Sequence, residues 1–119
     1  MADLTESRRT LEIAAQAASD KLGESILALD VAEQFGLADF FLIVSAKSDR
    51  QAKAIAEAIE ESLKEAGTPV LAREGLTAAR WILLDFGDLV VHVMLDEERD
   101  FYGLERMWRD CPLVALDLE

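Results

Sequence analysis

Apolar residues recur at helical spacing in two long segments of the chain. In 3–22 they fall every three or four positions, and Gly23 follows as a helix stop. In 48–66 they form a second stripe, which consists of Ala52, Ile55, Ala56, Ile59 and Leu63. This segment opens with a capping box, in which the Ser48 hydroxyl accepts from the Gln51 amide and the Gln51 side chain reaches back to Ser48. The pattern predicts two amphipathic helices, over 3–22 and 48–66.

Short apolar runs between turn residues predict five strands. They are 26–31, 40–44, 70–74, 80–85 and 88–94. The run 40–44 is apolar on both faces, which is typical of a strand at the centre of a sheet. Phe86 and Gly87 connect the last two runs, and the glycine supplies the positive φ that a tight hairpin requires.

A last helix is predicted near the C-terminus. The acidic residues 96–98 match the positive end of a helix dipole, and apolar residues follow at helical spacing up to Trp108. The element order α-β-β-α-β-β-β-α predicts an α/β fold with a mixed five-stranded sheet and flanking helices. The 48–66 helix is expected to connect two parallel strands by a right-handed crossover. Residues 1–110 form the single predicted domain, and 111–119 form a loosely held C-terminal tail.

The charge balance indicates which classes of partner the chain can bind. Its 119 residues include 24 acidic and 12 basic ones, which gives a formal net charge of -12. Affinity for naked nucleic acid comes largely from Lys and Arg that displace counterions, and the chain has no basic stripe or tail. A basic protein surface is a better match, although acidity of this size also serves solubility alone. No apolar run approaches the roughly 20 residues of a membrane span, and the N-terminus has no signal-type segment, so a cytoplasmic location is expected.

Few residues are suited to catalysis or metal binding. Cys111 is the single cysteine and His92 the single histidine, so neither an intramolecular disulfide nor a zinc site can be assembled. Asp85 and Asp88 flank the predicted hairpin, and a carboxylate pair at this spacing suits magnesium in phosphoryl transfer. Aspartates beside a glycine turn also have an ordinary role, because they cap exposed backbone N–H groups. We expect no catalytic residue, no metal and no cofactor.

Three large aromatic residues stand where core packing does not simply explain them. Trp81 begins a strand, Phe86 lies at the hairpin tip and Tyr102 lies near the start of the last helix. Such residues can close the edge of the core, but aromatics bordered by charges are also typical of protein-binding hot spots. The acidic border predicted here consists of Glu74, Asp85, Asp88, Glu98 and Glu105. An apolar centre with a negative rim is complementary to a Lys- and Arg-rich protein.

Five motifs within 24–108 closely resemble, in order, those of the Iojap-related ribosomal silencing factors. They are Asp39-Phe40-Phe41, Ser48-Asp49-Arg50-Gln51, Glu74-Gly75, Trp81 with Leu84-Asp85-Phe86-Gly87-Asp88 and His92, and Phe101-Tyr102-Gly103-Leu104-Glu105-Arg106-Met107-Trp108. The resemblance implies an α/β sandwich related to the nucleotidyltransferase fold. It further implies a protein that binds the fourteenth protein of the large ribosomal subunit, blocks association with the small subunit and represses translation, with no chemistry.

The resemblance also implies a docking surface and leaves two alternatives open. The implied surface consists of Trp81, Asp85, Phe86, Gly87, Asp88 and Tyr102, and His92 supports the turn from the sheet. One alternative is a nucleotidyltransferase-like enzyme that uses Asp85 and Asp88 with magnesium; the other is a homodimeric interaction domain whose aromatic edge pairs with itself. The phosphate-binding element of that enzyme fold begins with Gly-Ser, whereas the stretch 45–48 has no glycine. Here the chain departs from the family too, which commonly has glycine where Ala46 stands.

Overall fold

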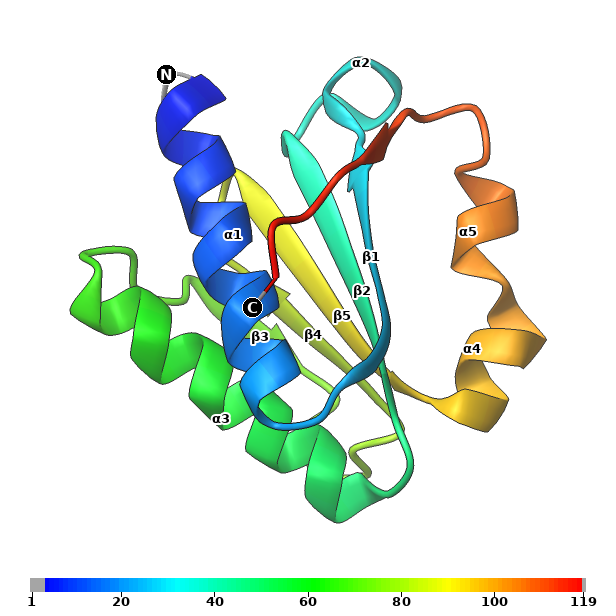
Figure 1. Ribbon diagram of the computed structural model, residues 1–119. Helices are drawn as coiled ribbons and strands as arrows, with labels where there is room; N and C mark the ends of the chain where they lie inside the picture. Colours follow the sequence, from blue (N-terminus) through cyan, green and yellow to red (C-terminus); the bar gives the residue numbers. More distant parts are fainter. Residues whose placement is uncertain (1–3, 119) are drawn as a thin grey trace.

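The apolar run predicted at the sheet centre forms a strand there in the computed structural model, which describes residues 4–118. This strand, β2 (Phe40–Ala46), is buried along its whole length. It pairs antiparallel with β1 (Glu24–Asp30) and parallel with β5 (Leu89–Leu95). Beyond β5 lie β4 (Trp81–Asp85) and the edge strand β3 (Ala72–Glu74), both in antiparallel pairing. The sheet order is β3-β4-β5-β2-β1-β6, as Figure 1 shows.

Two long helices pack side by side on one face of the sheet (Figure 1). They are α1 (Leu4–Asp20) and α3 (Asp49–Glu65), which confirms both predicted amphipathic helices; the predicted start at Asp3 lies outside the described residues. Ser48 caps α3 by accepting from the Gln51 N–H at 3.1 Å. The Gln51 side chain reaches the Lys47 N–H at 2.8 Å, one residue before the predicted position.

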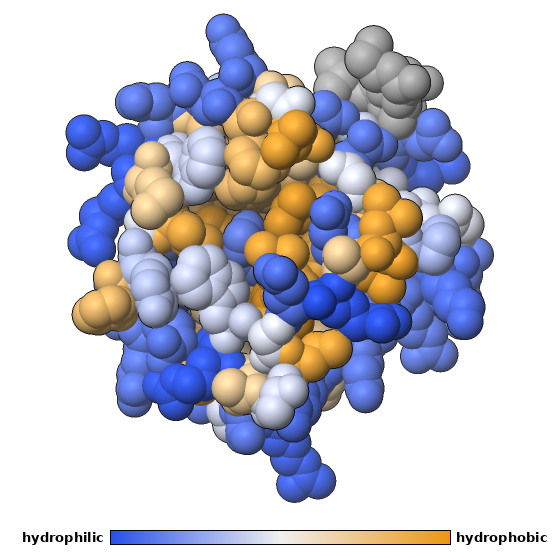
Figure 2. Space-filling model, turned by 180° about the vertical axis from the view of Figure 1, so that it is seen from behind, coloured by the Kyte–Doolittle hydropathy of each residue, from blue (hydrophilic) through white to orange (hydrophobic). Residues whose placement is uncertain are grey.

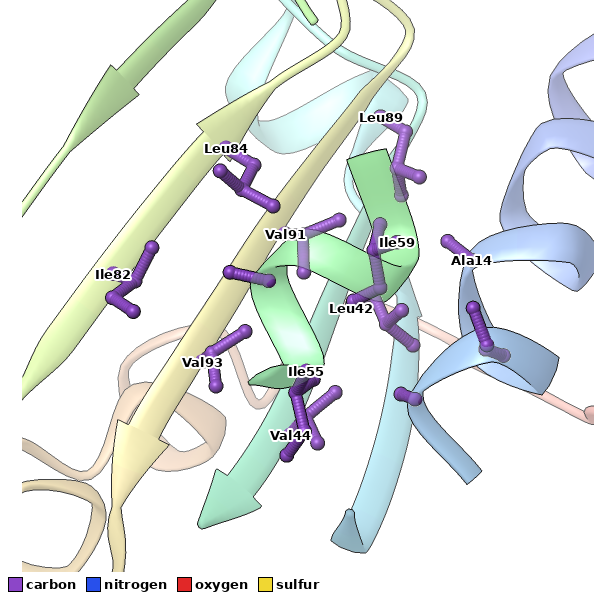
Figure 3. Close-up of a cluster of buried hydrophobic side chains, with 14 of the residues drawn as sticks. Ala14, Leu42, Val44, Ile55, Ile59, Ile82, Leu84, Leu89, Val91 and Val93 are labelled. Carbon is purple, nitrogen blue, oxygen red and sulfur yellow. The ribbon is translucent and has the colours of Figure 1, made fainter. Parts of the chain in front are cut away.

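The main hydrophobic core lies between these helices and the sheet. Ile55 and Ile59 of α3 are fully buried, as their position on the apolar stripe predicts. In Figure 3 they point toward the alternate residues of three strands, Leu42, Val44, Ile82, Leu84, Val91 and Val93. Burial of such side chains contributes about 1.5 to 3 kcal/mol each. No helix within residues 4–118 is long and apolar enough to cross a membrane.

The predicted last helix is broken in two at Gly103, so the single helix through Trp108 is wrong. Its two parts are α4 (Asp96–Tyr102) and α5 (Leu104–Met107). Gly103 adopts the left-handed conformation with φ of 57°, and its N–H donates to the Arg99 carbonyl as a helix cap. Glycine adopts this conformation without a steric penalty, and helix periodicity alone does not reveal such a cap inside an apolar stripe. A short helix, α2 (Ala32–Phe35), is a further addition to the predicted order.

The C-terminal tail joins the sheet, so the five-stranded sheet and the loosely held tail are both wrong. The sixth strand, β6 (Leu113–Val114), pairs antiparallel with β1. The chain then returns to α1, where the Arg8 guanidinium donates to the Ala115 carbonyl at 2.7 Å (Figure 1). A strand of two residues carries no readable alternation, but it provides hydrogen-bond partners for the backbone of β1 at the sheet edge.

Candidate docking site

The second face of the sheet is covered over only part of its width. Trp81, Leu83 and Asp85 of β4 point to this face and are partly buried, whereas Ile82 and Leu84 are fully buried on the helix side. Figure 2, seen from behind relative to Figure 1, shows apolar side chains gathered near the middle of the molecule with charged residues around them. The open part of this face is therefore a candidate surface for binding a partner.

Helix α4 is fixed beside this open face by Arg99, a buried residue that the sequence analysis did not single out. The Arg99 guanidinium donates to the Ser45 hydroxyl of β2 at 2.9 Å and to the Ser25 carbonyl of β1. Its Nε also lies 3.4 Å from a Glu105 carboxylate oxygen. A buried Arg is tolerated when it is paired and hydrogen-bonded, as here. These bonds hold the end of α4, and with it Tyr102, against the sheet.

Trp81 and Tyr102 come together in space, although 20 residues separate them in the chain. Their ring centroids are 4.8 Å apart, and Phe101 continues the row at 5.1 Å from Tyr102. Tyr102 is 47% exposed and Phe101 78% exposed. Offset and tilted aromatic contacts of this kind contribute about 0.5 to 1.5 kcal/mol beyond buried area. An exposed aromatic row of this size is available to a partner.

His92 lies behind Trp81 and opposite Leu83 in the sheet, and its predicted support of the hairpin turn stays a prediction. The Trp81 Nε1–H donates to His92 Nδ1 at 3.1 Å. Burial lowers the pKa of His92 from 6.5 to about 4, because water is not there to solvate the charged ring. The imidazole is therefore neutral near pH 7 and able to accept this hydrogen bond.

The hairpin turn at the other end of β4 behaves as its sequence predicts, with one exception. An Asp85 carboxylate oxygen accepts from the Gly87 N–H at 2.8 Å, and Gly87 has a φ of 93°. The Asp88 carbonyl accepts from the backbone of residues 39 and 40, which ties the turn to the start of β2. Phe86 is the exception: it is only 6% exposed and packs in the helix-side core, which favours a role in the core over a direct contact with a partner. Alternation along β4 gives the reason, since Phe86 shares the buried face of Ile82 and Leu84.

Two members of the predicted acidic border are paired with arginine side chains. Glu74 of β3 stands opposite Leu83 on the open face, beside the site. Glu98 accepts from Arg80, and Glu105 pairs with Arg99, so neither is a free acidic group. Leu83 was missed by the sequence analysis, although strict alternation between Trp81 and Asp85 puts it in the middle of the open strand face.

The described residues support a docking site better than they support a metal or catalytic site. Asp85 already uses one carboxylate oxygen within the turn. Across residues 4–118, no three His, Cys, Asp or Glu side chains gather closely enough to hold a metal ion. A groove of about 760 Å³ runs between α3 and the segment 69–76, and neither Asp85 nor Asp88 lines it. The candidate site of this molecule is thus the open strand face with its aromatic row.

Fold and site together define an α/β protein with a candidate docking face on its sheet. A family model described as ribosomal silencing factor during starvation matches residues 4–119. The chain belongs to this family, the ribosomal silencing factors, as its motifs predict. It is similar to the ribosomal silencing factor of Bacillus subtilis, with 49% identity over 107 residues that cover 90% of this chain and 91% of the relative.

More distant relatives and solved structures agree with this assignment. Chloroplastic Iojap of Zea mays is 32% identical over 105 residues, which cover 88% of this chain and 46% of Iojap. A crystal structure of a Chromobacterium violaceum protein has a TM-score of 0.82 and 36% identity, covering 90% of this chain and 87% of the other. A second crystal structure, from Bacillus halodurans, has a TM-score of 0.81 and 38% identity, covering 92% and 99%. The mixed α/β fold therefore recurs in experimental structures.

Proposed function

We propose that this protein binds the large ribosomal subunit through its fourteenth ribosomal protein, blocks association with the small subunit and so represses translation. Membership in the ribosomal silencing factor family implies ribosome-associated repression of translation. The observation that carries the proposed docking mode is the contact between the partly buried Trp81 and the 47% exposed Tyr102 beside the open strand face. The mechanism is steric: the folded domain occupies the place on the large subunit where the small subunit would bind, and so prevents the two subunits from joining.

The proposed docking surface runs along β4 from the aromatic row to the hairpin. Its members are Trp81, Leu83, Asp85, Gly87 and Asp88, with Glu74 and Tyr102 at the sides. Four residue steps separate Trp81 from Asp85, about 13 Å of extended strand. A central aromatic anchor with polar groups around it is the usual anatomy of a protein interface.

Electrostatics favour a basic protein as the partner. The formal net charge of -12 attracts a Lys- and Arg-rich surface and speeds the encounter, and salt screens this attraction. The acidic groups near the site, Glu74, Asp85 and Asp88, add local complementarity. We propose that the protein acts in the cytoplasm, that it requires no cofactor, and that it is a binding protein rather than an enzyme.

Co-sedimentation with isolated ribosomal subunits tests this function. We expect the wild type to pellet with large but not small subunits, and to reduce the fraction of subunits that join in a light-scattering assay. Trp81→Ala should weaken binding by about 2 kcal/mol or more if Trp81 is a central anchor. Leu37→Ala is the matched control, because it removes an 81% exposed apolar side chain outside the site. Failure of the wild type to pellet with large subunits would refute the function.

A charge-reversal pair tests where the acidic groups act. Asp88→Lys and Glu61→Lys change the net charge equally, but Glu61 is exposed on α3 and away from the docking surface. We expect only Asp88→Lys to slow association strongly at low salt, since its charge faces the basic partner directly. Equal effects of the two variants would leave net charge alone as the cause and remove Asp88 from the site.

A further inference from the structure

We infer that His92 is a positioning residue for docking: it fixes the orientation of the Trp81 indole and thereby the shape of the surface that a partner meets. The docking part of this inference rests on the proposed function. The contact between the two side chains rests only on the structure, where the Trp81 Nε1–H donates to His92 Nδ1 at 3.1 Å.

Packing does not explain a histidine at this position. His92 is 5% exposed in the middle of β5, and Val90 and Met94 flank it on the same face. Across the sheet it stands opposite Leu83 of β4 and Ile43 of β2. An apolar side chain would fill this layer without the cost of burying a polar ring. The His92 ring also meets the Phe41 ring edge to face with centroids 5.0 Å apart, but this contact requires only an aromatic ring, so the polar contact is what distinguishes the imidazole.

Within the described part of the chain, His92 makes one side-chain hydrogen bond, and it is the one with Trp81. A neutral imidazole that accepts at Nδ1 carries its proton on Nε2. His92 Nε2 is buried and has no hydrogen-bond partner among residues 4–118. A buried, unpartnered N–H lowers stability, so the imidazole holds the indole at a cost to the fold. Such a loss of stability in return for a fixed side-chain orientation is typical of a residue that serves a binding site rather than the core.

Two contacts from different elements define the position of the Trp81 ring. His92 of β5 holds the indole N–H, and Tyr102 of α4 packs against the ring with centroids 4.8 Å apart. Without the acceptor on His92, the indole N–H finds a partner only by turning toward water, and the side chain gains other rotamers. A partner that requires the original orientation then binds only the fraction of molecules that retain it.

Two substitutions of His92 separate the effect of its hydrogen-bond acceptor from the effect of its side-chain volume. His92→Leu keeps an apolar side chain of similar size without an acceptor, whereas His92→Asn offers its Oδ1 close to the position of Nδ1. We expect His92→Leu to be at least as stable as the wild type in urea melts, yet to bind large subunits roughly threefold to tenfold more weakly. We expect His92→Asn, once folded, to bind within about twofold of the wild type. A purely structural histidine would show the opposite: binding would follow stability.

The indole N–H resonance of isotope-labelled protein reports the same contact without the ribosome. Trp81→Phe identifies the resonance against that of Trp108. We expect slow hydrogen exchange of the Trp81 N–H in the wild type and in His92→Asn, and fast exchange in His92→Leu. If the wild type does not pellet with large subunits, the proposed function fails while this resonance still tests the contact.

Three results would overturn the inference. The first is an unprotected Trp81 N–H in the wild type, and the second is wild-type binding by folded His92→Leu. The third is a folded His92→Asn that protects the N–H but binds as weakly as His92→Leu. Should His92→Asn not fold, the wild type and His92→Leu decide the matter by resonance and binding together.

Discussion

Acid should weaken the folding of this protein through His92. Burial lowers the pKa of His92 from 6.5 to about 4, so the folded chain keeps the ring neutral over a range in which the unfolded chain protonates it. The unfolded state gains this proton as the pH falls below 6.5, and the folded state gains it only near 4. The stability that depends on a neutral His92 is thus fully present above pH 6.5 and is lost progressively down to about pH 4.

The size of the loss follows from the distance between the two pKa values. A pKa of about 4 against 6.5 corresponds to roughly 3 kcal/mol, of which about 2 kcal/mol is lost by about pH 5. Measurements that end at about pH 5 stay above the pI of about 4.4, where a protein without net charge tends to precipitate. A loss of this size is a large part of the stability of a small domain.

Urea melts of the wild type and His92→Leu, taken between about pH 7 and about pH 5, measure the effect. Both proteins contain the same 24 acidic residues, so the contributions of the carboxylates cancel in the difference. We expect the wild type to lose about 2 kcal/mol relative to His92→Leu over this range. A difference that changes by less than about 0.5 kcal/mol would refute the reasoning and show that His92 titrates alike in both states.

Three further predictions concern the core, the hairpin and chemistry. Ile55→Ala should cost roughly 2 to 5 kcal/mol in denaturant melts, because Ile55 is fully buried; a loss below about 0.5 kcal/mol would mean that its helix face is misplaced. Phe86→Ala should cost about 3 to 5 kcal/mol of stability but leave the binding of the folded protein to large subunits unchanged, and selective loss of binding would return Phe86 to the docking surface. Titration with magnesium and nucleotide should give no transfer product; turnover that disappears in Asp85→Asn would establish the enzyme instead.

The elements that the sequence predicts well are those with local causes. The stripe through Ile55 and the cap at Ser48 specify α3 within one segment of chain, and both are present in the structure. The strand 40–44 is predicted because a run that is apolar on both faces must be buried on both faces. The β6 strand and the break at Gly103 escape prediction, because one depends on a distant edge and the other on a single dihedral angle.

The sequence by itself determined the family, the two main helices, the sheet centre and the aromatic candidates Trp81 and Tyr102. The alternation along 81–86 also predicts that Phe86 is buried and that Leu83 lies on the open face of the sheet, although the sequence analysis above did not use it for these two residues. Only the tertiary structure brought Trp81 to Tyr102 and put His92 behind it, since these contacts join β4, β5 and α4 across 11 to 21 residues of chain. Local periodicity specifies which face a residue occupies, but which faces meet depends on strand order and on the position of α4, which the Arg99 bonds to β1 and β2 fix.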